Sequence, residues 1–200
     1  MASEIKANKI SPATGTAFTI GDSGDTFTVP SGATIVNSGT ATGFGGGKIL
    51  QVINGTILGE SFSSTSASFV DVTGVNATIV PSATSSKILV MMHTQIGNGS
   101  TNYGTLVRIV TGTSTEIFTG TNLGSRQSAF GGIGSIATGA SVDISSTYIH
   151  EPSTTSSLTY KLQVYCESGG TARIGASGNN GNSAYHPFTP TYINLMEIGA

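Results

Sequence analysis

The stretch SKILVMMHTQI, residues 86–96, is typical of a β-strand, and a turn-like segment rich in small polar residues follows it. No helical period of 3.6 residues persists for longer than a turn or two, and the intervening turns are rich in Gly, Ser and Asn. This pattern predicts a β-sandwich or jelly-roll head over residues 48–200. Nine further strand-like runs lie at 48–53, 67–72, 75–80, 104–110, 115–120, 141–151, 158–167, 172–176 and 191–199.

The composition of the whole chain agrees with an all-β fold. Only 9% of the 200 residues are charged, against roughly 25% in an average soluble domain. The chain holds 27 Ser, 29 Thr and 28 Gly, together 84 residues, so hydroxyl groups and backbone form most of the expected surface. Ile, Val and Thr recur in short runs, which favours folded β structure over disorder.

The N-terminal part has a different sequence pattern. Residues 12–43 contain a loose repeat of about ten residues, TAFTIGDSG, DTFTVPSG, ATIVNSG and TATGFG, each of which predicts a strand closed by a turn. Phe18 and Ile20 share one face of their strand, as do Phe27 and Val29, because side chains two apart point the same way. Such a stripe is marginally stable in water, so either the rest of the chain or identical copies must cover it.

Glycines mark the expected boundary between the two parts. We expect an N-terminal attachment segment and β-repeat stem over residues 1–44, a glycine linker at 45–47 and the head at 48–200. The segment GFGGGK resembles a phosphate-binding loop only superficially, because Thr42 and Ile49 stand where that loop needs Gly and Ser or Thr.

Several classes of chemistry are excluded by these residues. A net charge of −2 without basic runs argues against nucleic acid as a partner. The three histidines have no metal-ligand spacing, Cys166 is the single cysteine, and the carboxylates sit in no recognisable catalytic setting. We therefore expect no enzyme activity, no cofactor and no metal. A signal peptide and long apolar segments are missing, so we expect synthesis in a cytoplasm and no membrane insertion.

Three long polar loops are the candidate binding elements of the head, because binding residues concentrate on loops that a rigid scaffold holds. They lie at 97–103, 121–134 and 177–188. Their amides, one guanidinium and three rings suit a sugar hydroxyl array or a polar protein surface, although plain turns are the alternative reading. The candidate binding residues are Asn98, Asn102, Tyr103, Arg126, Asn179, Asn180, Asn182, Tyr185 and His186.

The stretch SEIKANKISPATGTAFTIGDSGDTFTVPSGATIVNSGTATGFGGGKILQVI resembles the repetitive segments of tail-fibre and related virion fibre proteins of bacteriophages, especially marine ones. The sequence pattern of YIHEPSTTSSLTYKLQV and of the terminal YINLMEIGA is similar to that of their distal domains. This resemblance implies a parallel homotrimer, attached to other virion proteins through its N-terminal part, with the head on the exterior of the particle facing the host. It implies no catalytic residue.

A trimeric, intertwined stem also makes physical sense of the apolar stripe. Three copies would turn these side chains toward a shared axis and bury surface that one chain leaves in water. The expected trimer-interface residues are Phe18, Ile20, Phe27, Val29 and Ile35.

The leading hypothesis is thus a non-enzymatic virion fibre protein whose head adsorbs to a host surface glycan or protein. One alternative is a capsid decoration or adaptor protein without receptor binding. Two others are a free lectin-like module and a polysaccharide depolymerase.

Overall fold

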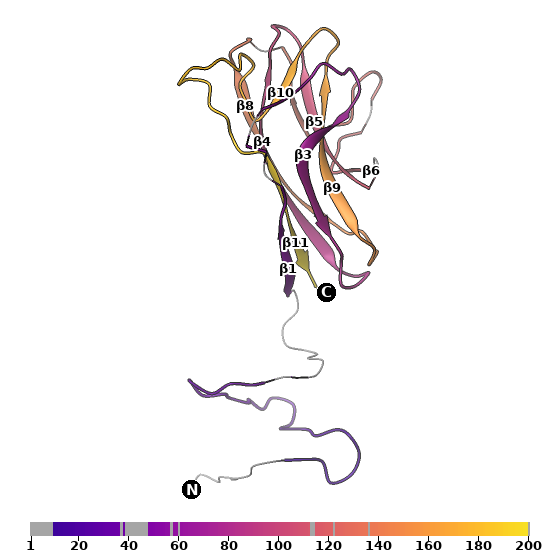
Figure 1. Ribbon diagram of the computed structural model, residues 1–200. Helices are drawn as coiled ribbons and strands as arrows, with labels where there is room; N and C mark the ends of the chain where they lie inside the picture. Colours follow the sequence, from indigo (N-terminus) through magenta and orange to yellow (C-terminus); the bar gives the residue numbers. More distant parts are fainter. Residues whose placement is uncertain are drawn as a thin grey trace. The chain divides into compact units, whose positions relative to one another are not determined.

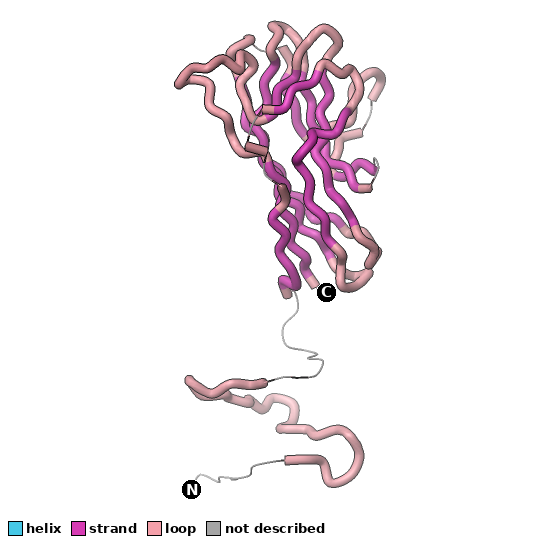
Figure 2. The backbone as a smooth tube through the Cα atoms, in the orientation of Figure 1, coloured by secondary structure: helices cyan, strands magenta, loops and turns pink. Residues whose placement is uncertain are grey.

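The computed structural model describes residues 10–36, 38, 48–56, 58–59, 61–112, 115–121, 123–135 and 137–199. The chain forms two compact units, residues 1–44 and 45–200. Eleven strands and no helix occur in the residues that the structure describes, and all the strands belong to the second unit, the head (Figure 2). The predicted all-β class and sandwich-like head are confirmed.

Two sheets form the head (Figure 1). The six-stranded sheet has the order β1-β11-β4-β10-β2, and β8 pairs with the other edge of β4; the five-stranded sheet has the order β3-β9-β5-β6, with β7 also on β5. The six-stranded sheet contains β1 (Ile49–Asn54), β2 (Phe62–Ser64), β4 (Lys87–Asn98), β8 (Ser141–His150), β10 (Ala172–Ile174) and β11 (Tyr192–Ile198). The five-stranded sheet contains β3 (Val70–Ile79), β5 (Thr105–Thr111), β6 (Thr115–Ile117), β7 (Gly131–Ile133) and β9 (Leu158–Cys166).

The core lies between the sheets, because alternate residues of each strand point inward. One buried polar pair belongs to it: the ring nitrogen Nδ1 of His150 lies 2.8 Å from the hydroxyl of the fully buried Tyr160. Burial lowers the pKa of His150 and raises that of Tyr160. Typical core residues are Val90, Met92, Ile193 and Leu195 from the larger sheet and Val107, Ile109, Leu162 and Val164 from the smaller one.

Each of the ten predicted runs overlaps a strand, with three differences of detail. The runs 67–72 and 75–80 belong to one strand, β3, whose register against β9 shifts between Asp71 and Asn76, where Gly74 has a φ of 87°. A glycine in this left-handed conformation bends a strand without ending it. The strands β2 (FSS) and β7 (GGI) were not predicted, because each holds a single large apolar residue next to small ones, and the second lies inside a predicted loop.

The N-terminal unit differs from expectation. The strands predicted within 12–43 are absent from residues 12–36, which form turns and irregular chain in this single copy. A β-strand needs a neighbouring strand to hydrogen-bond with, and a single copy of the chain supplies none to residues 12–36. The turn expected from the GDSGD segment is confirmed, because the Asp25 carboxylate accepts the N–H of Asp22 at 2.8 Å. Residue 37, residues 39–43 and the linker at 45–47 lie outside the described residues.

Candidate functional site

Asn98, one of the predicted binding residues, is an interior anchor. Its side chain is fully buried, and its amide donates to the hydroxyl of Thr105 at 3.1 Å. Its carbonyl oxygen accepts the backbone N–H groups of Ser100 and Thr171 at 2.9 and 3.2 Å. This placement corrects the expectation of a surface contact, because the amide fastens the 97–103 loop to its neighbours and does not face a ligand.

The other two predicted residues of that loop lie closer to the surface. Asn102 is exposed, has a φ of 71° and accepts a hydrogen bond from Ser135 at 2.8 Å. The half-buried ring of Tyr103 packs against Gly169, where an added Cβ would lie 2.8 Å from the ring. These contacts join the 97–103 loop to two other loops of the head.

The loop at 177–188 carries the predicted residues Asn179, Asn180, Asn182, Tyr185 and His186. Asn179, Asn182 and Tyr185 are exposed, the last with 89% of its surface in solvent. Asn180 Oδ1 and His186 Nδ1 are buried and have no hydrogen-bond partner among the described residues. The loop therefore carries exposed and buried polar groups close together in sequence.

The loop that bears Arg126 is firmly attached to the smaller sheet. The Ser128 hydroxyl donates to the carbonyl of Gly120 at 2.6 Å, and the N–H of Phe130 donates to the carbonyl of Val107 at 3.1 Å. The side chain of Arg126 is exposed, and its neighbours Ser125 and Gln127 line a cavity. This loop therefore forms one wall of a pocket.

The cavity has a volume of about 400 Å³ and lies over the outer face of the five-stranded sheet. Leu106 of β5 stands between Tyr165 of β9 and Gly132 of β7 in direct register. Glu167 follows β9, and its carboxylate accepts the N–H of Gly104 at 2.9 Å. The lining residues are Gly104, Leu106, Ser125, Gln127, Gly132, Ile133, Gly134, Tyr165 and Glu167.

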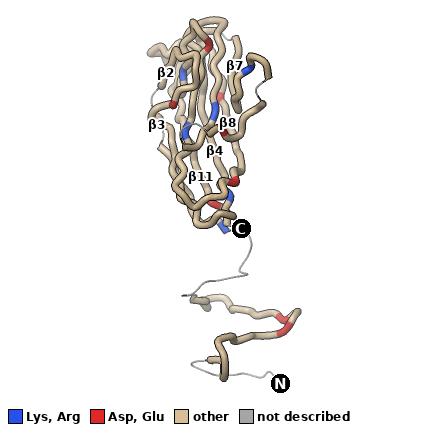
Figure 3. Tube along the Cα trace, turned by 90° about the vertical axis from the view of Figure 1, so that its right-hand side faces the viewer, with Lys and Arg blue, Asp and Glu red and all other residues tan. Residues whose placement is uncertain are grey.

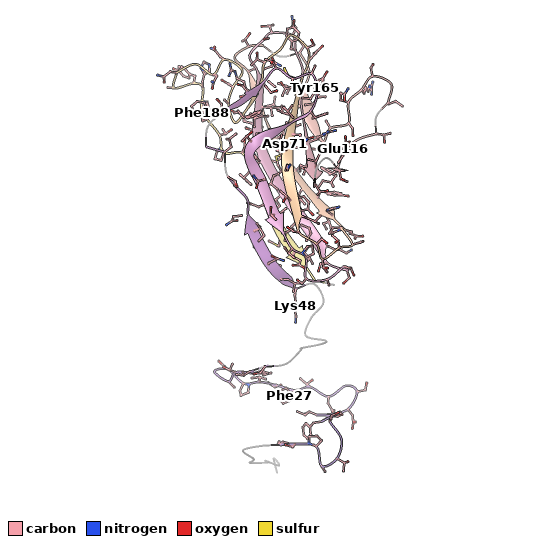
Figure 4. All side chains as sticks on the ribbon, turned by 45° about the vertical axis from the view of Figure 1, so that its right-hand side comes forward. Phe27, Lys48, Asp71, Glu116, Tyr165 and Phe188 are labelled. Atoms are coloured by element: carbon pink, nitrogen blue, oxygen red, sulfur yellow. The ribbon has the colours of Figure 1, made fainter. Side chains whose placement is uncertain are left out.

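A row of polar side chains crosses the same outer face beside the cavity. Gln163 of β9 joins the two sides of the row, because its amide donates to Asp71 at 2.7 Å and its carbonyl accepts from Arg108 at 2.8 Å. Arg108 also pairs with Glu116, and Lys161 pairs with Asp71 at 3.0 Å. Figure 4 shows Asp71, Glu116 and Tyr165 on this part of the head.

Charges and aromatic rings reinforce that row. The guanidinium of Arg108 lies 4.0 Å from the centre of the Phe69 ring, which packs against Tyr165 at 5.6 Å. Partial burial opposes ionisation of Asp71, but hydrogen bonds from Gln163 and Lys161 and the charge of Lys161 outweigh it and lower its pKa. Lys, Arg, Asp and Glu are spread thinly over the head (Figure 3), and on this face four of them form two ion pairs that are linked through Gln163.

The outer face of the six-stranded sheet carries one row of apolar side chains among polar ones. Val52 of β1 lies opposite Met196 of β11, Met196 lies opposite Leu89 of β4, and Leu89 lies opposite Ile149 of β8. Val52 and Ile149 are exposed, and the other two are half-buried. These four residues form a continuous cross-strand row, which we call the apolar row. Its sequence signal was weak, because four strands from distant parts of the chain each supply one residue.

No group of three or more potential metal ligands occurs among the residues that the structure describes. Cys166 is buried, as its place in an apolar strand indicated, and burial raises the pKa of its thiol. The described part of the chain contains no helix of the length and hydrophobicity that a membrane crossing requires.

Sequence comparison finds no matching protein-family model and no matching curated protein. Among solved structures, the chain is similar to a chain of the T=1 particles derived from infectious bursal virus, with 13% identity and a TM-score of 0.35 over 74% of this chain and 35% of that one. It is also similar to a chain of the Gt strain of infectious bursal disease virus, with 13% identity and a TM-score of 0.37 over 76% and 37%. The protein thus spans about a third of the length of those chains. TM-scores this low do not establish a common fold.

Proposed function

We propose that this chain is a non-enzymatic structural protein of a bacteriophage particle. Its N-terminal unit attaches to other virion proteins and holds three copies together, and its head lies on the exterior and adsorbs to the host cell surface. The resemblance of the N-terminal repeat to virion fibre proteins supports the class.

The exposed apolar side chains of the N-terminal unit carry the proposal. Phe18, Ile20, Phe27, Val29 and Ile35 are all exposed in the single chain, with 67% of Phe27 in solvent. Apolar patches rimmed by polar residues are typical of surfaces that bind another protein. Because the described residues of this unit form no strand and leave these side chains in water, copies of the chain or a partner stabilise the unit.

A second observation favours self-association. The apolar row on the outer face of the six-stranded sheet includes Val52 of β1, the strand that begins the described part of the head. Copies joined through their N-terminal units would raise the effective concentration of one head near another. The apolar row then offers a further contact between copies.

The capsid decoration or adaptor alternative predicts the same assembly without adsorption. A depolymerase is disfavoured by the pocket, because glycoside hydrolysis uses two carboxylates and Glu167 is the single carboxylate that lines it.

The assembly part is tested by the mass of the full chain in solution. We expect three copies, and we expect the double substitution Phe18→Asp and Phe27→Asp to give monomers with a folded head. The matched control is Leu123→Asp, which places the same charge on an exposed apolar residue of a head loop and should leave the trimer intact. A monomeric wild-type chain would contradict the proposal.

Particle location and adsorption need separate measurements. Antibody labelling of particles in electron microscopy should place the head on the exterior surface. Fluorescently labelled full chain should bind host cells. If antibodies label the particles but the fluorescent chain does not bind cells, the decoration alternative is favoured.

A further inference from the structure

The cavity beside Tyr165 combines an apolar floor, an aromatic ring and a few polar groups. Its floor is apolar, because Leu106 fills the space above Gly132, where an added Cβ would lie 2.3 Å from a Leu106 methyl carbon. The ring of Tyr165 stands next to Leu106 in register. Ser125, Gln127 and Glu167 supply a hydroxyl, an amide and a carboxylate. A pocket of this size with an apolar surface and a few polar groups is typical of a small-ligand site.

The pocket is built before any ligand arrives. Glu167 is held on both sides, since its carboxylate accepts the N–H of Gly104 and its own N–H donates to the Gly104 carbonyl at 3.0 Å. The wall that carries Ser125 and Gln127 is fastened by the Ser128 and Phe130 hydrogen bonds described above. A preformed site loses less conformational entropy on binding than a flexible loop would.

Charge narrows the ligand class. Glu167 is the one carboxylate among the residues that line the pocket, and no Lys, Arg or His is among them, so an anionic ligand would meet a like charge there. The Gln127 amide donates and accepts hydrogen bonds, the Ser125 hydroxyl does the same, and the carboxylate accepts. A neutral sugar has hydroxyl groups for these partners and a carbon–hydrogen face for an aromatic ring.

We propose that this pocket binds one neutral hexose unit of a surface saccharide, with the sugar's carbon–hydrogen face on Tyr165 and its hydroxyl groups on Gln127 and Glu167. The inference rests on the proposed adsorption of the head to a host surface, and it names the site and the ligand class. Of the three predicted loops, it selects the one at 121–134, together with the face of the five-stranded sheet.

The test uses nuclear magnetic resonance of the full chain with methyl glucoside, methyl galactoside, methyl mannoside and methyl glucuronide as probes. We expect at least one neutral hexoside to bind in the millimolar range and to shift the backbone resonances of Gln127 and Tyr165. Gln127→Ala and Tyr165→Ser should weaken binding about tenfold or more, which is about 1.4 kcal/mol. Tyr165→Phe keeps the ring and should change affinity less than about threefold.

Two controls separate the pocket from general effects. Tyr192→Ser removes a half-buried tyrosine from the other sheet and should leave hexoside binding unchanged. The anionic glucuronide should bind more weakly than the glucoside, and Glu167→Gln should reduce that difference. Absence of binding by all three neutral hexosides, or binding unaffected by both Gln127→Ala and Tyr165→Ser, would overturn the inference.

Failure of the pocket inference can be distinguished from failure of the proposed function. If full chain carrying Gln127→Ala still adsorbs to host cells like wild type, the head adsorbs through another surface and the pocket inference is wrong. If hexosides bind the pocket but antibodies find no copy of the protein on particles, the virion assignment fails while the saccharide site stands.

Discussion

Glu197 and Ser82 are 115 positions apart in the sequence, and the carboxylate oxygen Oε1 of Glu197 accepts both the backbone N–H and the hydroxyl of Ser82, at 2.6 and 2.8 Å. The other oxygen, Oε2, accepts the side-chain amide of Gln51. Glu197 is fully buried, and no cation pairs with it in the described part of the chain. One carboxylate thus ties together β1, β11 and the loop between β3 and β4.

Replacing this carboxylate should destabilise the head. In Glu197→Gln an NH₂ group replaces one acceptor oxygen and faces donors, so at least one buried hydrogen bond to a charged group is lost. We expect the free energy of unfolding to fall by about 1.5 to 3 kcal/mol in urea titration. Glu151→Gln, at an exposed ion pair with Lys87, is the matched control and should lower the free energy of unfolding much less. Equal stability of the two variants would contradict this role.

Stability should also fall in acid because of Glu197. Burial alone would raise its pKa, but hydrogen bonds from Gln51 and Ser82 outweigh that effect and lower the pKa from 4.5 to about 2. The unfolded chain binds the proton more readily, so this contribution is complete above pH 4.5 and is lost as the pH falls toward 2. Thermal unfolding between pH 7 and pH 2 measures it. The lowered pKa values of Asp71 and Glu151 make stability fall in acid in the wild type and in Glu197→Gln alike. The variant lacks the contribution of Glu197, so its stability should fall less between pH 7 and pH 2.

Gly178 should tolerate no side chain. An added Cβ would lie 2.1 Å from the carbonyl oxygen of Asn98 and 2.4 Å from that of Thr138, both backbone atoms. Gly178→Ala should therefore cost about 1 to 3 kcal/mol, or prevent the loops from packing together. Gly139→Ala has open space for its Cβ and no left-handed φ, and should change stability by less than about 0.5 kcal/mol. A neutral Gly178→Ala in the same urea titration would refute this packing.

Asn98 should affect stability and not adsorption. Asn98→Ala leaves the backbone N–H groups of Ser100 and Thr171 without their acceptor, at an expected cost of about 1 to 3 kcal/mol. Asn179→Ala, on the exposed part of the 177–188 loop, should change stability by less than about 0.5 kcal/mol. Differential scanning calorimetry gives both values, and a stable Asn98→Ala with reduced cell binding would restore the surface role.

Much of the head could be predicted because strand formation is a local pattern. The run at 86–96 became β4, and 191–199 became β11, since short apolar runs that turn residues bound and that have no helical period are typical of strands. The pocket could be predicted only in part. The loop at 121–134 was identified from its polarity, but Tyr165 was hidden in a strand, where its outward direction follows only from the alternation of Lys161 and Gln163 with buried neighbours.

Residues close together in the chain specify the all-β class, the strands of the head and the change of sequence pattern before Lys48. Contacts between distant segments turn Asn98 inward, join Glu197 to Ser82, and place Leu106, Tyr165 and Gln127 around one cavity. Strand order and register are fixed by packing between segments far apart in sequence, which no local pattern encodes.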